Sequence, residues 1–405
     1  MTRRGLGRGQ LPLMVLLGAC SSLGPLALNV YLPGRPAVQA SLGGDLAALQ
    51  ATVSLPLLAF GLALVLLGPV ADQYGRRTTL LSGLVLFCAG CLLATLAPTL
   101  ALLSVGRIVA SVGTATTFIA SRAVVADLAP REQLQRSVAQ ITMIMLVVQM
   151  VAPILGNGVL AFGGWRAIQS GLLVLGLGIF VAVWFAVPET LHTGRDAPTR
   201  SGSPLDLLVP TVALLRRRTF VILLLQVGLL YSAYPAFISI APDLMIDVFH
   251  RPATDYSYYY AWLPLGYFAG NAFVLRFSSR WGTQRLVTAG GVVAILACGL
   301  SLLLLWAGVL HPLALFVPAG MLVNFGIGLS LPSVSASAVN AAWPNTASGW
   351  GLVGFAQQAI AALGVQALGY LPSDSAFPVV WISLALAAAA LALQGLPRHA
   401  SPQAP

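Results

Sequence analysis

Long apolar stretches alternate along the chain with short polar or charged segments. A helix needs about 20 mainly apolar residues to cross the hydrocarbon core of a bilayer, and each stretch reaches roughly that length. The first stretch begins near Leu11, and each one is predicted to form a transmembrane helix. The pattern predicts an all-α polytopic membrane protein with twelve transmembrane helices. The predicted spans after the first are 48-71, 78-97, 99-122, 136-160, 167-188, 219-241, 256-278, 285-307, 311-333, 346-369 and 376-396.

The first predicted helix has features at both ends that need an explanation. Arginines precede its apolar run, as in a secretory signal, and 17-20 resembles a lipoprotein cleavage box. Cleavage there would discard half of a span and leave an odd number of helices. We therefore expect an uncleaved helix, with Pro33, Gly34 and Pro36 breaking or kinking its outer end.

The composition agrees with the membrane prediction. Hydrophobic residues make up 58% of the chain, charged residues only 8%, and the mean hydropathy is +0.88. About a quarter of the residues in a soluble globular protein are charged. The net charge of +10 is scattered between apolar spans instead of being gathered into a basic patch, so nucleic-acid binding is not expected.

The arginines predict the orientation in the membrane, because cytoplasmic loops are enriched in positive residues. All 21 basic residues are arginine, and with the N-terminus inside, seventeen of them fall in cytoplasmic segments. Only Arg35, Arg166 and Arg251 fall outside, and Arg107 lies within a span. We therefore expect both termini in the cytoplasm, in a bacterial inner membrane.

A connector divides the predicted helices into two sets of six. Residues 191-218 are rich in Pro, Ser, Gly and Arg, which is typical of a solvated linker. The expected domains are an N-terminal half at 1-190, this cytoplasmic connector, and a C-terminal half with a short tail at 219-405. A faint repeat supports duplication, since Tyr74-Gly75 recurs as Trp281-Gly282 at an offset of about 207 residues. Duplicated halves of this kind form a substrate site between them and alternate access by rocking.

A short charged joint connects the second and third predicted helices. Gly75 can supply a positive φ for a tight turn, and Asp72 is placed to accept hydrogen bonds from the next helix. Arg76 and Arg77 mark the cytoplasmic side. Taken alone, the pattern fits an ordinary arginine-anchored hairpin equally well.

The order of residues in this joint resembles the helix 2–3 signature of the major facilitator superfamily. Segments 23-43, 106-127, 150-160 and 163-168 follow at offsets similar to those of its bicyclomycin and chloramphenicol exporter branch. The resemblance covers most of 11-190 and is weaker beyond 219. It implies a conformational latch that holds the halves in one state, formed by Gly68, Asp72, Gly75, Arg76 and Arg77.

Few polar residues lie within the predicted spans, and Arg107 is the one cation far from a span end. It is about eight residues into its helix, roughly 12 Å along the axis, where an unpaired charge is costly. Its guanidinium either reaches back to the outer interface or, as the resemblance implies, faces the cavity and contacts helix 1. No acidic residue is predicted to be within a span; Asp243, for example, is expected outside.

Asn29 departs from the family pattern. Relatives usually carry an acid before the Val30-Tyr31-Leu32-Pro33 segment, and that acid takes up and releases a proton. An amide retains hydrogen bonding but cannot titrate. Other amides and a helix 7 aromatic stripe are expected either to line the cavity or to pack helices together. The predicted substrate-binding residues are Asn29, Tyr31, Arg107, Gln149, Tyr231, Tyr234, Phe237, Asn271 and Gln357.

The fifth predicted helix contains a segment that resembles an antiporter motif of the superfamily. Pro153 is expected to bend this helix, while Gly156 and Gly158 would permit close approach of a neighbour. A kinked packing helix with no role in transport direction is the alternative.

These features predict a secondary-active efflux transporter of small, mostly neutral, amphenicol-like compounds, with proton coupling. A facilitator or uptake permease for a small polar metabolite is the alternative. No enzyme, cofactor, metal site or nucleic-acid partner is expected; the expected partners are small-molecule substrates, protons and membrane lipid, and a monomer is expected. The four cysteines lie in apolar stretches and are expected to act as small hydrophobes.

Overall fold

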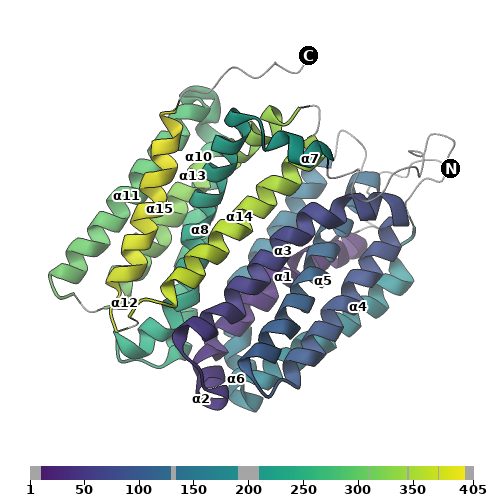
Figure 1. The fold of residues 1–405 in the computed structure, drawn as a ribbon, viewed down its shortest axis with the longest axis horizontal. Coiled ribbons are helices and arrows are strands. Elements are labelled where there is room, and N and C mark those ends of the chain that lie inside the picture. Colours follow the sequence, from purple (N-terminus) through teal and green to yellow (C-terminus); the bar gives the residue numbers. More distant parts are fainter. Residues whose placement is uncertain are drawn as a thin grey trace. The chain divides into compact units, whose positions relative to one another are not determined.

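The computed structural model describes residues 11–128, 134–189, 209–309, 311–343, 346–372 and 374–396. Within these ranges the chain forms helices joined by short turns, and no strand is present (Figure 1). A helix satisfies its own backbone hydrogen bonds, which is the condition for crossing lipid where no water is available. The predicted all-α architecture is confirmed.

The described residues separate into two compact units, and α3 contributes to both. Unit 1 holds Met1–Leu42 and Leu62–Leu208, and unit 2 holds Gly43–Gly61 and Val209–Pro405. The helices of unit 1 are α1 (Leu11–Tyr31), η2 (Leu32–Gly34), α2 (Arg35–Leu42), the end of α3 (Leu46–Tyr74), α4 (Arg76–Thr95), α5 (Leu100–Leu128) and α6 (Leu134–Ala186).

Unit 2 begins with the first part of α3 and continues after residue 208. Its remaining elements are α7 (Val209–Leu214), α8 (Arg218–Asp247), η5 (Ala253–Asp255), α9 (Tyr256–Tyr260), α10 (Trp262–Trp281), α11 (Thr283–Trp306), α12 (Pro312–Leu315), η6 (Phe316–Leu322), α13 (Val323–Ala341), α14 (Thr346–Leu368) and α15 (Phe377–Gln394).

Ten ranges among the described residues are long and apolar enough to span a membrane. One of them, Gln140–Ala186, covers two predicted spans, and its helix is interrupted by the non-helical Gly163 and Gly164. The predicted span 256-278 is occupied by α9 and α10, which are not among the ten. The helices are therefore consistent with the twelve predicted spans.

The predicted internal repeat is present in the backbone. Gly75 precedes α4 with φ 95° and ψ 148°, and Gly282 precedes α11 with φ 73° and ψ 153°. Almost only glycine adopts this region of φ/ψ space. The two tight turns therefore have the same geometry at the offset of about 207 residues read from the sequence.

In unit 1, α4 and α5 lie side by side at very short distance (Figure 1). A Cβ atom added at Gly90 would lie 2.2 Å from the backbone nitrogen of Ala110 and 2.5 Å from the carbonyl oxygen of Gly106. Small residues allow such close backbone packing in membranes, where helix association depends on van der Waals contact.

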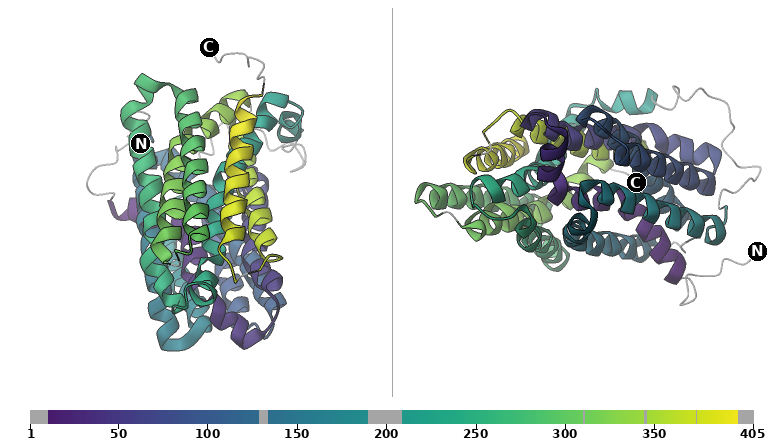
Figure 2. Two further views of the ribbon diagram at one scale, coloured as in Figure 1. Left: turned by 90° about the vertical axis from the view of Figure 1, so that its left-hand side faces the viewer. Right: turned by 90° about the horizontal axis from the view of Figure 1, so that it is seen from below.

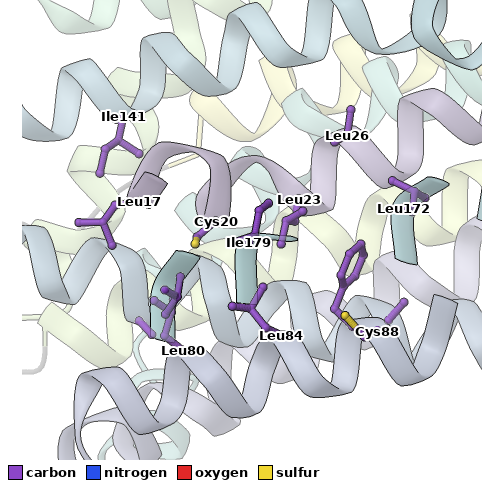
Figure 3. Close-up of a cluster of buried hydrophobic side chains, with 14 of the residues drawn as sticks. Leu17, Cys20, Leu23, Leu26, Leu80, Leu84, Cys88, Ile141, Leu172 and Ile179 are labelled. Atoms are coloured by element: carbon purple, nitrogen blue, oxygen red, sulfur yellow. The ribbon is translucent and has the colours of Figure 1, made fainter. Parts of the chain in front are cut away.

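The core of unit 1 is an apolar cluster between α1, α4 and α6 (Figure 3). Leu17, Cys20 and Leu23 of α1 are fully buried there, together with Leu80 and Leu84 of α4. All four cysteines are free and buried, which confirms their prediction as small hydrophobes.

In unit 2, α8 is the central helix. It packs against α13, α14 and α15, while α11 packs against α13 and α15. The green and yellow helices of this unit run roughly parallel in the left view of Figure 2. The extensive burial of α8 agrees with its mainly apolar sequence.

Two charged residues were predicted in the wrong environment. Arg35 was expected in an outer segment, but the chain turns through η2 and continues as α2, so its side chain is 0% exposed. Asp243 was expected outside the spans, but α8 extends to Asp247 and buries it. The predicted break at Pro33 and Gly34 is confirmed as this short 3₁₀ turn.

The predicted domain boundaries 1-190, 191-218 and 219-405 stay a prediction, and residues 191–208 of the connector lie outside the described residues.

Candidate functional site

Arg107 of α5 lies over the aromatic ring of Tyr31 at the end of α1. Its Cζ atom is 3.7 Å from the ring centroid, and both side chains are buried. A desolvated cation–π contact contributes about 2 kcal/mol. The contact with helix 1 was predicted, and the burial of Arg107 argues against a guanidinium that reaches the outer interface.

Asn29 lies on α1 two residues before Tyr31, and therefore on a different face of the helix. Its Nδ2 donates a 2.8 Å hydrogen bond to the carbonyl oxygen of Pro25, one turn earlier. The buried Oδ1 has no hydrogen-bond partner among the described residues. A ligand hydroxyl or a water could donate to this acceptor.

Gly156 of α6 brings its helix against α1 next to these residues. A Cβ atom at Gly156 would lie 2.4 Å from the carbonyl oxygen of Val30, so the predicted close approach is confirmed there. At Gly158 no atom lies within 4 Å, and the same prediction is wrong at that position. Pro153 lies inside α6, and Gln149 is half-buried one turn before it.

The predicted aromatic stripe of α8 joins other aromatic rings in unit 2. The Tyr234 hydroxyl is 2.7 Å from the Tyr260 hydroxyl of α9, and Phe237 packs edge-to-face on Phe316 of η6 at 5.2 Å. Phe237 is 1% exposed. In this structure Phe237 therefore packs within unit 2, whereas Tyr234 is only partly buried.

The amides of unit 2 make contacts both between helices and within a single helix. Tyr231 and Gln358 hydrogen-bond through their side chains, whereas the predicted Gln357 is its half-buried neighbour. Asn271 donates to the carbonyl oxygen of Tyr267 at 2.9 Å.

A polar group between the first part of α3 and α14 was missed by the sequence analysis. Ser54 donates to Gln366 Oε1 at 2.7 Å, and Gln366 donates to the carbonyl oxygen of Ala47. One turn from Ser54, Gln50 is fully buried, and its amide atoms have no partner among the described residues.

The joint between α3 and α4 is tied to the ends of two other helices. Arg76 Nε donates to Asp127 Oδ2 of α5 at 3.3 Å, and the Arg76 backbone N–H donates to Glu189 Oε1 at 2.9 Å. Glu189 follows α6 and satisfies one of the free N–H groups at the start of α4. The sequence predicted that the carboxylate of Asp72 accepts hydrogen bonds at the start of α4. Glu189 makes a contact of this kind.

Arg77 also reaches α6. Its Nη2 donates to the carbonyl oxygen of Trp184 at 2.6 Å, and its Cζ lies 5.4 Å from the indole ring. For the predicted latch residues Gly68 and Asp72, the surroundings of the first and the side chain of the second lie outside the described part of the chain.

The structure therefore brings Tyr31 and Arg107 together in unit 1. In unit 2 it gives each of the predicted aromatic residues of α8 a partner. Arg35, Asp127, Glu189 and Trp184 were missed because their roles depend on tertiary contacts. Their only signal was a polar or aromatic side chain at the end of an apolar span.

The sequence pattern of the Major Facilitator Superfamily matches residues 15–365 of this chain. The chain is 28% identical over 329 residues to multidrug resistance protein D of Escherichia coli (strain K12), covering 81% of this chain and 80% of that protein. It is 26% identical over 392 residues to a chloramphenicol resistance protein of Pseudomonas aeruginosa, covering 95% and 90%. The fold is similar to the crystal structure of a D-xylose-proton symporter, with a TM-score of 0.75, 14% identity and coverage of 96% and 98%.

Proposed function

Because the chain belongs to the major facilitator superfamily, it is a multi-pass membrane transporter and not an enzyme, and we propose that it exports small, mostly neutral, apolar compounds. The names of the Escherichia coli and Pseudomonas aeruginosa relatives, which refer to multidrug and chloramphenicol resistance, support efflux of this class. We place the transporter in a bacterial inner membrane with both termini in the cytoplasm.

We infer a preference for neutral compounds from the sign of the buried charges in unit 1. Among its described residues the buried charged side chains are Arg35 and Arg107, both positive, and Asn29 cannot ionise. A permanently cationic drug would lose its hydration and meet like charge. A neutral amphenicol-like compound avoids this cost and can hydrogen-bond to an amide such as Asn29.

We propose that export uses alternating access and is driven by a proton gradient. The chain contains no lysine, so it has no Gly-x-x-x-x-Gly-Lys loop to hold the phosphates of ATP. Because the amide of Asn29 does not titrate, another group carries the proton. Two halves at 1-190 and 219-405, joined by the connector 191-218, would move against each other, and a monomer is sufficient.

We propose roles for the predicted residues on the same basis. Tyr231, Tyr234, Phe237, Asn271, Gln149 and Gln357 contribute to substrate binding along with Asn29, Tyr31 and Arg107. Pro153 and Gly156 fix the path of α6 beside α1. Gly68, Asp72, Gly75, Arg76 and Arg77 form the latch.

Replacing Asp72 by Ala tests the latch. We expect Asp72→Ala to reduce transport strongly while the protein still inserts in the membrane at normal levels. Wild-type transport rates from a well-expressed Asp72→Ala protein would remove the basis for the latch.

The alternative is a facilitator or an uptake permease for a small polar metabolite. The observation in its favour is Asn29, since a carrier without an acid at this position has one fewer site for proton exchange. Such a protein would move substrate down its gradient and would confer no drug resistance.

One experiment separates these functions. The protein is expressed in a host that lacks its own exporters, and resistance to a drug panel is measured together with uptake into everted vesicles. An exporter gives resistance and uptake that falls when the pH gradient is collapsed. A facilitator gives uptake that does not depend on the gradient, and an inert protein gives neither.

A further inference from the structure

Gln50 is a buried amide of α3 whose hydrogen-bonding groups are both unused. The residue is 0% exposed, and neither its Nε2 nor its Oε1 has a hydrogen-bond partner in the part of the chain that the structure describes. An unpaired polar group in an apolar interior is destabilising, and most buried polar groups in native proteins are paired. The donor and the acceptor of this amide are therefore both available to a ligand.

The backbone on either side of Gln50 lies against α14. Ser54 donates to Gln366 Oε1 at 2.7 Å, and Gln366 Nε2 donates to the carbonyl oxygen of Ala47 at 3.2 Å. Gln50 is three residues after Ala47 and four before Ser54, and residues at these spacings are neighbours on one side of a helix. These contacts pair the amide of Gln366, whereas the amide of Gln50 stays unpaired.

Gly369, directly after α14, lies next to the side chain of Gln50. A Cβ atom added at Gly369 would lie 3.1 Å from Gln50 Cβ and 2.8 Å from Ala47 Cα, so the two segments come very close together at this point. The side chain of Gln50 therefore leaves α3 on the side that faces the end of α14. All of these residues belong to unit 2.

The two unpaired atoms of this amide define the chemistry of a matching ligand. Nε2 needs an acceptor and Oε1 needs a donor, and both atoms belong to one planar group. A carboxylate has no donor for Oε1, an ammonium has no acceptor for Nε2, and either ion would lose its hydration in an apolar interior. A neutral group that presents N–H and C=O on the same edge satisfies both atoms at once. Lactams, cyclic imides and ureas have such an edge.

We propose that Gln50 binds the N–H and C=O edge of a neutral lactam-type compound through two hydrogen bonds. The proposal rests on the proposed export of neutral compounds and names a substrate class for it. Val53 and Leu57 continue the same side of α3 and are buried, which suits a ligand with an apolar body. Because Gln50 is buried in this structure, the ligand reaches it in another state of the transport cycle.

A matched pair of ligands tests the site: carbostyril, a lactam fused to a benzene ring, and N-methylcarbostyril. The methyl group removes the donor and keeps the carbonyl group and the rings. The Kd of each ligand for purified wild-type protein in detergent is measured by isothermal titration calorimetry. A site that hydrogen-bonds a ligand N–H discriminates strongly against an analogue that lacks it. We expect carbostyril to bind at least about tenfold more tightly, a difference of about 1.4 kcal/mol.

Variants of Gln50 assign this preference to the residue. Gln50→Leu should bring the two Kd values within about twofold of each other. It should also leave Tm unchanged or raise it, because an apolar side chain of similar size replaces an unpaired amide. Gln50→Asn keeps an amide on a shorter side chain and should retain part of the preference. It also serves as the test if Gln50→Leu does not fold.

The matched control is Gln366→Leu, which removes a paired amide from the same helix contact. It loses the hydrogen bonds to Ser54 and Ala47, so Tm should fall while the preference for carbostyril remains. A purely structural role for Gln50 predicts the reverse for Gln50→Leu, namely a lower Tm with an unchanged preference. That result would overturn the proposal, and so would equal affinity of the wild-type protein for the two ligands.

The lactam site and the proposed export function fail separately. If vesicles transport a neutral amphenicol but wild-type protein binds the two lactams equally, the site is wrong and the export function stands. If carbostyril binds through Gln50 but no drug is transported, the site stands and the proposed function is wrong.

Discussion

At the scale of single residues, the chemistry of unit 1 depends on how a buried cation is stabilised. Arg107 stacks on Tyr31, which supplies the negative face of an aromatic ring in a position where water is scarce. Asn29 lies nearby in sequence with an acceptor that has no partner among the described side chains. Under the proposed function, this combination would favour ligands that donate to an amide and do not carry a positive charge.

Replacing Tyr31 tests this stabilisation. Tyr31→Leu removes the ring and with it about 2 kcal/mol of cation–π energy, so we expect a lower Tm and weaker drug transport. Tyr31→Phe keeps the ring and should lose less of both quantities. The comparison is made by thermal unfolding in detergent and by vesicle uptake; equal damage from the two substitutions would show that the ring face is not the important feature.

The two turn glycines give a second test at this scale. Ala at Gly75 or Gly282 must adopt a φ/ψ region that costs about 1–3 kcal/mol, so both variants should lower Tm. Around Gly282 no atom lies within 4 Å, whereas a Cβ at Gly75 would lie 2.6 Å from Glu189 Oε2. We expect Gly75→Ala also to reduce transport, because it displaces the carboxylate that accepts the Arg76 N–H.

Gly178→Ala is the control for these glycine variants, since Gly178 has open space and an ordinary helical φ. It should leave both Tm and transport near the wild-type values. If Gly282→Ala is as harmless as Gly178→Ala, the strain argument fails.

At the scale of helices, the start of α4 connects three elements. Arg76 bonds to Asp127 at the end of α5 and to Glu189 after α6, while Arg77 bonds to the backbone at Trp184. The Arg76 and Asp127 side chains are 15% and 28% exposed. A partly exposed ion pair of this kind contributes only about 1 kcal/mol or less to stability. Its value for function would lie in fixing the ends of the helices.

Asp127→Asn separates stability from function in this group. We expect it to shift Tm only slightly and to slow transport markedly, because the joint loses a charged anchor. The matched control is Asp255→Asn, which removes the partner of Arg251 in another surface ion pair. Transport by Asp127→Asn at the same rate as by Asp255→Asn would contradict a role for the pair in the transport cycle.

The helices themselves were largely predictable, because an apolar run of spanning length has few alternatives in a membrane. The turn at Gly75 and its repeat at Gly282 were predictable as well, since the glycine requirement is local. The continuation of the chain into α2 was not, because Pro33 and Gly34 normally end a helix. The burial of Arg35 and Asp243 and the partners of Arg76 depend on which helices pack together, and no local pattern contains that information.

At the scale of the whole molecule, the contacts divide the chain between two units, and α3 belongs to both. Its first part shares a polar group with α14 in unit 2, and its end lies in unit 1. The repeated turns show that the sequence resemblance between the units extends to their backbone geometry. Such internal repeats are the framework for alternating access in this superfamily.

Asn29 links the residue scale to the behaviour of the whole transporter. An aspartate at this position would supply a negative charge that can also take up and release a proton. We therefore expect Asn29→Asp to move the substrate range toward cations and to make uptake by everted vesicles depend more strongly on the pH gradient. Rates are compared at equal expression with the gradient present and collapsed, and unchanged selectivity and pH dependence would show that position 29 sets neither.

The central claim is that wild-type protein prefers neutral, apolar compounds to permanent cations. Its most direct test is the initial rate of uptake into everted vesicles, measured side by side for a neutral amphenicol and a quaternary ammonium dye, with vesicles lacking the protein as background. We expect the amphenicol to be taken up at least about tenfold faster, since a difference of about 1.4 kcal/mol in the cost of desolvating the cation suffices for this ratio. Faster uptake of the dye than of the amphenicol would contradict the account.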